Sequence, residues 1–136
     1  MQSNDILEPS SDLTNSAAAR VAIITDSIAQ VPPELARELE IRIVPFSVVV
    51  EDETLEDLSD VNLSTLYHRM RHEKHLRLST SAPSVGIYYD AFLNAFKSGA
   101  VSVVYVGLAS RLSHAFSSAV EATRMLRENG VKQAIS

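Results

Sequence analysis

The sequence predicts an α/β domain with a mostly parallel sheet flanked by helices. Short runs of β-branched residues alternate with helical patterns along the chain, which is the arrangement that builds parallel sheets. Hydrophobic residues make up 46% of the 136 residues, enough for one compact core without disulfides or metal ions. In folds of this class ligands gather at the carboxyl ends of the strands, so we expect the functional residues there.

The first third of the chain predicts two strands around a short helix. Residues 21–25 form an apolar run that is typical of a strand buried on both faces. The prolines at 32–33 suit the first turn of a helix over 34–40, because the N–H that proline lacks would be unpaired there anyway. Residues 41–50 are mostly β-branched or aromatic and predict a second strand, interrupted at Pro45, which has no N–H to donate to a ladder.

The middle of the chain predicts a loop, a helix and a connector. Residues 51–60 are acidic and lack a hydrophobic period, which indicates a loop. Asn62 suits the N-cap of a helix in which apolar residues recur at helical spacing, and this helix should end near Lys74. Residues 78–84 are rich in hydroxyl side chains and indicate a connector.

The last third predicts a helix, a strand and a second helix. Ser84 suits the N-cap of a helix that stops near Gly99, and residues 101–106 form a second buried apolar run. The next helix ends at Gly130, and residues 131–136 resemble the approach to a strand that the chain does not complete. We therefore expect a truncated chain.

Composition excludes several classes of function. The formal net charge of -5 repels a phosphate backbone on average, so nucleic acid is not an expected partner. The chain has no cysteine, which excludes thiolate catalysis and fits a cytoplasmic location. No run approaches the roughly 20 apolar residues of a membrane span, and residues 1–19 indicate a disordered leader or a cloning remnant. Fold prediction therefore starts at residue 20.

Small hydroxyl residues recur where strands or connectors end. Neutral hydroxyls and the free N–H groups of helix starts suit a carboxylate or a phosphate. The alternative is that serine and threonine serve only as loop and cap residues. The segments concerned are Thr25-Asp26-Ser27, Ser79-Thr80-Ser81, and Ser110 with Ser113.

Several segments together resemble the DegV family of bacterial fatty-acid-binding proteins, over about residues 20 to 136. The most specific are Thr80-Ser81-Ala82-Pro83-Ser84, similar to the family's Thr-Ser-Gln-Pro-Ser, and Leu108-Ala109-Ser110-Arg111-Leu112-Ser113, similar to its Leu-Ser-Ser-x-Leu-Ser-Gly. The others are Ile23-Ile24-Thr25-Asp26-Ser27, Val31-Pro32-Pro33-Glu34-Leu35, Ile43-Val44-Pro45-Phe46-Ser47-Val48 and Asp60-Val61-Asn62 to Tyr67. Three positions depart from the pattern: Ala82 replaces Gln, Ala109 replaces Ser and His114 replaces Gly.

The resemblance implies a carrier and not an enzyme. It implies that residues 20–136 are the amino-terminal lobe of a protein about twice as long, which holds a long-chain fatty acid between two lobes and presents it to a fatty acid kinase subunit. No cofactor or metal is implied. Losing the second lobe should bare an apolar face and favour self-association. By position, Thr80 and Ser110 match the carboxylate-binding hydroxyls, Asp26 and Ser27 line the same site, and Ser81 and Ser113 assist through helix starts.

Other functions have weaker support in the sequence. His68, His72 and His75 have helical spacing, but no carboxylate is firmly placed to complete a metal shell, and the surrounding basic residues favour a solvated face or a dock for an acidic partner. The hypothesis that the chain is a phosphotransferase rests on fold analogy, and the reaction would need His114 as its nucleophile. The third alternative is a folding unit that is inactive without its second lobe.

Overall fold

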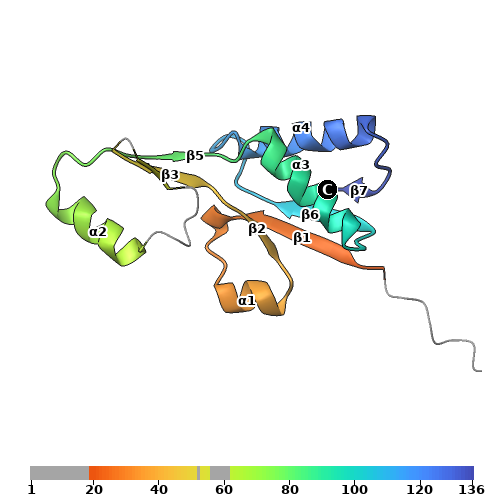
Figure 1. Cartoon of the computed structure of the whole chain (residues 1–136), viewed down its shortest axis with the longest axis horizontal. Coiled ribbons are helices and arrows are strands. Elements are labelled where there is room, and N and C mark those ends of the chain that lie inside the picture. Colours follow the sequence, from red (N-terminus) through yellow and green to blue (C-terminus); the bar gives the residue numbers. More distant parts are fainter. Residues whose placement is uncertain (1–18, 52, 56–61) are drawn as a thin grey trace, which may run out of the picture.

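The chain folds into a parallel sheet with helices and a smaller antiparallel sheet joined to it (Figure 1). The computed structural model describes residues 19–51, 53–55 and 62–136. Sheet A contains β1 (Val21–Asp26), β2 (Arg42–Val44), β6 (Ser102–Val106) and β7 (Ala134–Ile135), and sheet B contains β3 (Ser47–Val50), β4 (Glu53–Leu55) and β5 (Leu78–Ser81). The helices are the 3-10 turn η1 (Ser27–Ala29), α1 (Pro33–Glu38), α2 (Leu63–His72), α3 (Val85–Lys97) and α4 (Ala115–Glu128).

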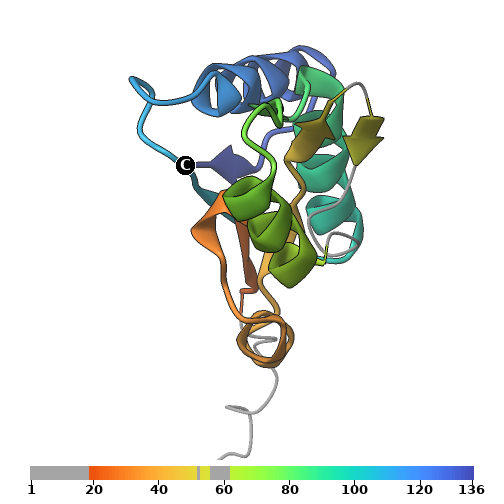
Figure 2. The ribbon, with the colours of Figure 1, turned by 90° about the vertical axis from the view of Figure 1, so that its left-hand side faces the viewer.

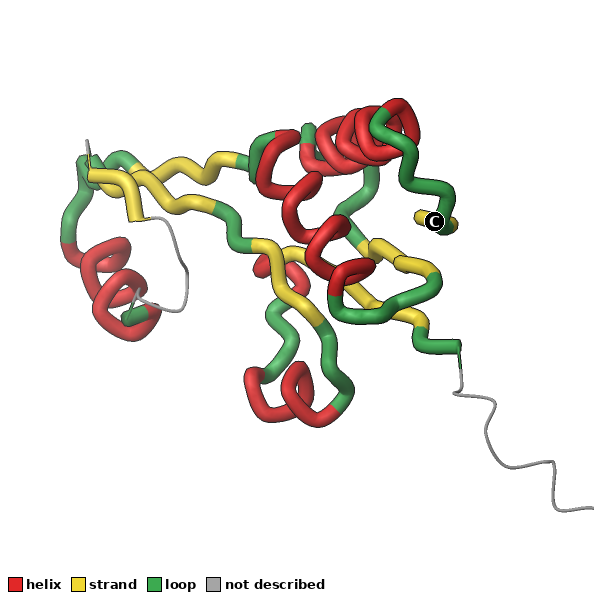
Figure 3. The backbone as a smooth tube through the Cα atoms, turned by 45° about the vertical axis from the view of Figure 1, so that its right-hand side comes forward, coloured by secondary structure: helices red, strands yellow, loops and turns green. Residues whose placement is uncertain are grey.

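Sheet A confirms the predicted α/β class with a mostly parallel sheet. Its strand order is β2-β1-β6-β7 and every pairing is parallel. Right-handed crossovers from β1 to β2 and from β6 to β7 run in opposite directions across the sheet, so they place their helices on opposite faces. Accordingly α3 and α4 lie together on one side of the sheet and the short α1 lies on the other (Figures 2 and 3). Almost all of the leader predicted at residues 1–19 lies outside the described residues.

Only one face of sheet A is fully covered, which corrects the prediction of strands buried on both faces. Ile24 and Val103 are completely buried beneath α3 and α4, whereas Val21 is 50% exposed and Val106 is 58% exposed on the opposite face. The reason is that the six-residue α1 is too short to cover the strands. We call this the open face; its exposed apolar members are Val21, Ile23, Ile43, Val104 and Val106.

The packing of α3 against α4 depends on small side chains. Ala119 and Ala122 on α4 are buried and let the two helices approach closely, while Tyr88 and Phe92 of α3 fill the space above sheet A. The predicted cap at Ser84 is confirmed, since its Oγ accepts a hydrogen bond from the N–H of Ile87 at 3.4 Å. We call sheet A with α1, α3 and α4 the body.

Sheet B with α2 forms an extension of the body, which we call the arm (Figure 1). The interruption predicted at Pro45 is confirmed, because β2 ends at Val44 in sheet A and β3 begins at Ser47 in sheet B. The connector predicted over residues 78–84 is wrong in its first half, since β5 pairs antiparallel with β3. The loop predicted over residues 51–60 contains β4, and its residues 52 and 56–60 lie outside the described residues.

A small core holds α2 against sheet B. Val48, Val50 and Leu66 are buried together, with Leu76 packed against them. The predicted N-cap is confirmed, because Oδ1 of Asn62 accepts a hydrogen bond from the N–H of Thr65 at 3.1 Å. The helix ends at His72, close to the end predicted near Lys74. No helix in the described part of the chain is long and apolar enough to cross a membrane.

Candidate functional site

The carboxyl edge of sheet A is the candidate position for a ligand site. From β1 the chain first adds β2 on one side and later adds β6 on the other, so the strand order reverses at β1. In open α/β sheets the crevice at such a reversal is the usual ligand site, because the loops that leave the two neighbouring strands diverge there. The loops concerned follow Asp26 in β1 and Val106 in β6.

The loop after β1 holds two of the predicted site residues in fixed positions. Asp26 is 1% exposed and caps η1, since its Oδ1 accepts a hydrogen bond from the N–H of Ile28 at 3.1 Å. Oγ of Ser27 accepts a hydrogen bond from the N–H of Phe46 at 2.9 Å. Phe46 lies between β2 and β3, so Ser27 ties the edge of sheet A to the joint where the arm begins.

Two tyrosines complete the surroundings of Asp26. The hydroxyl of Tyr105 on β6 donates a hydrogen bond to Oδ2 of Asp26 at 3.1 Å and lies 3.0 Å from the hydroxyl of Tyr88 on α3. Burial raises the pKa of both phenols above the ordinary tyrosine value, and the neighbouring carboxylate acts in the same direction. Both hydroxyls therefore stay protonated at neutral pH. Neither tyrosine was predicted from the sequence to lie at the site.

Thr80 and Ser81 lie at the end of β5, on the arm side of the same joint. Both side chains are exposed. Ser81 pairs with Ser47 in the register of sheet B, and Ser47 follows Phe46 directly. The hydrogen bond from Phe46 to Ser27 thus brings the loop after β1 and the end of β5 to one region of the molecule.

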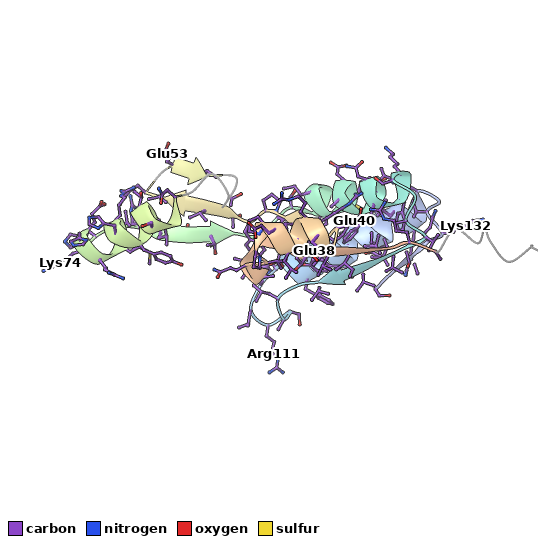
Figure 4. All side chains as sticks on the ribbon, turned by 90° about the horizontal axis from the view of Figure 1, so that it is seen from below. Glu38, Glu40, Glu53, Lys74, Arg111 and Lys132 are labelled. Carbon is purple, nitrogen blue, oxygen red and sulfur yellow. The ribbon has the colours of Figure 1, made fainter. Side chains whose placement is uncertain are left out.

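Ser110 and Ser113 lie in the loop that joins β6 to α4, at the same edge of sheet A. Oγ of Ser113 accepts a hydrogen bond from the N–H of Ala115 at 3.1 Å, so it caps the first turn of α4. Ser110 is exposed, and the side chain of the next residue, Arg111, points away from the body (Figure 4). Within the described residues no hydrogen bond joins this loop to Thr80 or Ser81.

An apolar cleft of about 370 Å³ begins beside this edge, between α4 and the covered face of sheet A. Its lining comes from α3, α4, β6 and β7 together with Ser136, and Phe92 and Tyr105 form part of its wall. Along α4 it extends from Phe116 to Arg127, a distance of about 16 Å at 1.5 Å per residue. This cleft was not predicted from the sequence. The feature that could have indicated it is a stripe of side chains along α4, next to the stripe of buried alanines: Phe116, Val120, Thr123, Arg124 and Arg127.

The histidines do not form a metal site in the part of the chain that the structure describes. The rings of His68 and His72 stack with centroids 4.2 Å apart, and Nδ1 of His72 lies 2.8 Å from the backbone oxygen of His68. That nitrogen is therefore occupied. No group of three or more His, Cys, Asp or Glu side chains could hold a metal ion among the described residues. His114 is exposed and precedes α4 without capping it through its side chain.

The chain is thus an α/β domain with a polar strand edge and an apolar cleft beside it. A family model described as "Uncharacterised protein, DegV family" matches residues 20–134. The chain belongs to the DegV family.

Curated relatives extend well beyond the length of this chain. A DegV domain-containing protein of Halalkalibacterium halodurans is 34% identical over 107 residues, which are 79% of this chain and 38% of that protein. A DegV domain-containing protein of Streptococcus pneumoniae is 34% identical over 105 residues, which are 77% of this chain and 36% of that protein. The chain therefore spans less than two fifths of each of these relatives.

Solved structures that match this chain are also much longer than it is. A stearic acid-binding protein of Eubacterium ventriosum has a TM-score of 0.77 and 27% identity, over 85% of this chain and 40% of that one. DegV of Bacillus subtilis, described as a fatty acid binding protein, has a TM-score of 0.72 and 25% identity, over 88% of this chain and 40% of that one. A fatty acid-binding protein of Thermotoga maritima has a TM-score of 0.71 and 27% identity, over 86% of this chain and 41% of that one.

Proposed function

We propose that this chain binds a long-chain fatty acid as a cytoplasmic carrier and catalyses no reaction on it. The observation that carries the proposal is the apolar cleft beside a strand edge rich in hydroxyls. A cleft of this size and character suits a ligand with a long apolar part and one polar end. The similar proteins that are described as binding fatty acids support the same choice of ligand.

The polar edge would hold the carboxylate through neutral hydroxyls. Thr80 and Ser110 are exposed and able to donate. The hydroxyls of Ser27 and Ser113 accept backbone N–H groups and still have their own proton to donate. Ser81 lies beside Thr80, and the N-terminus of the 14-residue helix α4 adds a favourable dipole. Asp26 contributes by holding its loop in place and does not bind the ligand directly. Its carboxylate is buried, and it cannot accept a hydrogen bond from a second carboxylate.

The cleft would hold the acyl chain. Burial stabilises by about 0.8 kcal/mol per methylene, so each carbon that enters the cleft adds measurably to the affinity. The cleft accommodates only part of a long chain between α4 and sheet A. We propose that a second lobe, in the longer proteins of the family, encloses the rest, and that the complete carrier presents the acid to a fatty acid kinase subunit.

A locally basic surface at the end of α2 and just after it is our candidate for docking that subunit. Arg69 is already paired with Glu73, at 2.9 Å from Nε to Oε1, so it is not available. Arg71 and Lys74 are exposed and have no acidic partner among the described residues. Lys74 lies at the far end of the arm (Figure 4). Charge reversal at Arg71 and Lys74 should weaken docking to the kinase subunit in surface plasmon resonance; undiminished docking would rule this surface out.

The open face of sheet A would make the chain self-associate. Its apolar side chains form a continuous surface over three neighbouring strands, and such surfaces attract a second copy. Sedimentation velocity should show dimers or larger species, and Val106→Asp should shift the protein toward the monomer. Leu112→Asp is the matched control, because Leu112 is 76% exposed but lies outside the open face.

Native mass spectrometry of the purified protein, followed by organic extraction, tests the proposed ligand. We expect a stoichiometric fatty acid that is lost in Thr80→Ala or Ser110→Ala. Ser79→Ala is the control, since Ser79 is an exposed hydroxyl on the same strand as Thr80 but outside the proposed site. Protein that carries no lipid, and takes up none from palmitate or oleate, would contradict the proposal.

A further inference from the structure

The buried carboxylate of Asp26 needs an explanation beyond ligand contact. It is 1% exposed, and no cation pairs with it among the described residues. One oxygen accepts the N–H of Ile28 and the other accepts the hydroxyl of Tyr105, so both oxygens are engaged inside the protein. A buried anion is stable only where such hydrogen bonds replace water.

The donor count fixes the direction of the hydrogen bonds. Tyr105 has one hydroxyl proton, which it gives to Asp26, so the contact between the two phenols must have Tyr88 as donor and Tyr105 as acceptor. The result is a relay from Tyr88 through Tyr105 to Asp26. It joins α3, β6 and β1 at the carboxyl edge of sheet A.

Gly107 allows the ring of Tyr105 to adopt this position. A Cβ at residue 107 would lie 2.2 Å from the hydroxyl oxygen of Tyr105, so the phenol passes directly over the glycine on its way to Asp26. The ring also makes edge contacts with Phe92, with centroids 6.1 Å apart. It therefore has one polar end fixed at the strand edge and an apolar side that forms part of the cleft wall.

We propose that Tyr105 is a specificity-determining residue, held by Tyr88 and Asp26 so that only the side of its ring faces the cleft. The proposal rests on the proposed function, because it concerns which acyl chains the cleft accepts. While the relay is intact, the ring cannot rotate into the cleft without leaving a buried carboxylate and a buried hydroxyl unpaired. The wall therefore has a fixed position beside the part of the acyl chain that enters the cleft, and acids that fit this position to different extents bind with different affinity.

Binding of a series of saturated acids tests this proposal. Dissociation constants for laurate, myristate, palmitate and stearate are measured by isothermal titration calorimetry with the wild type, Tyr105→Phe, Tyr88→Phe and Tyr67→Phe. We expect Tyr105→Phe to reduce the ratio between the weakest and tightest constants by about tenfold, because a freed ring adapts to each chain. Tyr88→Phe should have a smaller effect, since the bond to Asp26 remains. Tyr67 is exposed on the arm, so Tyr67→Phe should behave as wild type.

The possible outcomes separate this inference from the function on which it rests. A wild type that binds none of the four acids overturns the proposed function, and the inference with it. A wild type that binds them, with the same ratio in Tyr105→Phe and Tyr67→Phe, overturns the inference alone. Equal weakening of all four acids in Tyr105→Phe would show a role in stability only, and would also overturn it.

Discussion

The body and the arm are each built from a sheet and the helices packed on it, but they differ in how much apolar surface they bury. The body encloses Tyr88, Phe92, Ile24, Val103 and Leu126 almost completely. The described core of the arm has three buried residues and one partly buried neighbour. Because stability follows buried apolar surface, the body should unfold as the main cooperative unit, and the arm should open at lower cost. The proposed carboxylate site has residues from both regions, so ligand binding should stabilise the arm more than the body.

Phe92→Ala gives the largest expected change in the body. Phe92 is fully buried between α3 and sheet A, so its truncation should lower the free energy of unfolding by about 3–5 kcal/mol. Urea denaturation measures the change. The control is Leu112→Ala, at a position 76% exposed, where we expect a change within about 0.5 kcal/mol. Similar losses in the two variants would mean that Phe92 is not part of the core.

Leu66→Ala is the corresponding change in the arm. Leu66 is 9% exposed and is the contribution of α2 to the small core with Val48 and Val50. We expect local opening of the arm to become easier by about 2 kcal/mol, at the lower end for such truncations because a small core relaxes readily. Amide hydrogen exchange should accelerate in β3 and β5 and stay unchanged in β1 and β6. Equal acceleration in β1 would show that body and arm unfold as one unit.

The N-caps of α3 and α2 test the same difference in stability between body and arm, with smaller expected effects. Ser84→Ala removes the cap of α3 in the body and Asn62→Ala removes that of α2 in the arm, each at a cost of about 1 kcal/mol. The first should lower the urea midpoint of the whole protein. The second should only speed amide exchange in the arm. If Asn62→Ala lowers the midpoint as much as Ser84→Ala, the arm is required for the stability of the body.

Local signals in the sequence predicted breaks and helix caps better than strand pairing and burial. The break at Pro45 and the caps at Asn62 and Ser84 depend on single residues and were predicted correctly. Strand β5 was missed because its residues Leu78–Ser81 are all exposed and carry no alternation; it is a strand only because β3 pairs with it. Exposure of the open face was also missed, since an apolar run does not reveal whether a second layer of helices covers it.

The candidate site shows the same division between local and long-range information. Hydroxyl residues at strand ends were recognised from the sequence, and the structure places all of them at or near the carboxyl edge of sheet A or the joint of the arm. The cleft was not recognised, because its lining comes from four separate elements. The relay was not recognised either, since Tyr105 is 79 residues away from Asp26 along the chain. Such contacts follow from the topology of sheet A and not from any motif.

The ion pairs on α2 and α4 give the smallest expected difference between the arm and the body. Arg69 holds Glu73 on the arm through two hydrogen bonds, and Arg124 holds Glu121 on α4 of the body while also contacting Glu128. The hydrogen bond to arginine lowers the pKa of both Glu73 and Glu121. Each pair therefore contributes stability above the pKa of a glutamate in the unfolded chain, and this contribution is lost as the pH falls through the lower folded value.

Carboxyl carbon NMR shifts followed from pH 7 to pH 2 measure both titrations. We expect Glu73 and Glu121 to titrate below the ordinary glutamate range, and Arg69→Gln or Arg124→Gln to raise the pKa of its own partner only. Both pairs are exposed, so the effect on stability is small in either region. If the arm opens more readily than the body, Glu73 should return toward the unfolded pKa at mild urea concentrations at which Glu121 keeps its lowered value. Parallel return of the two values would mean that the arm is as stable as the body.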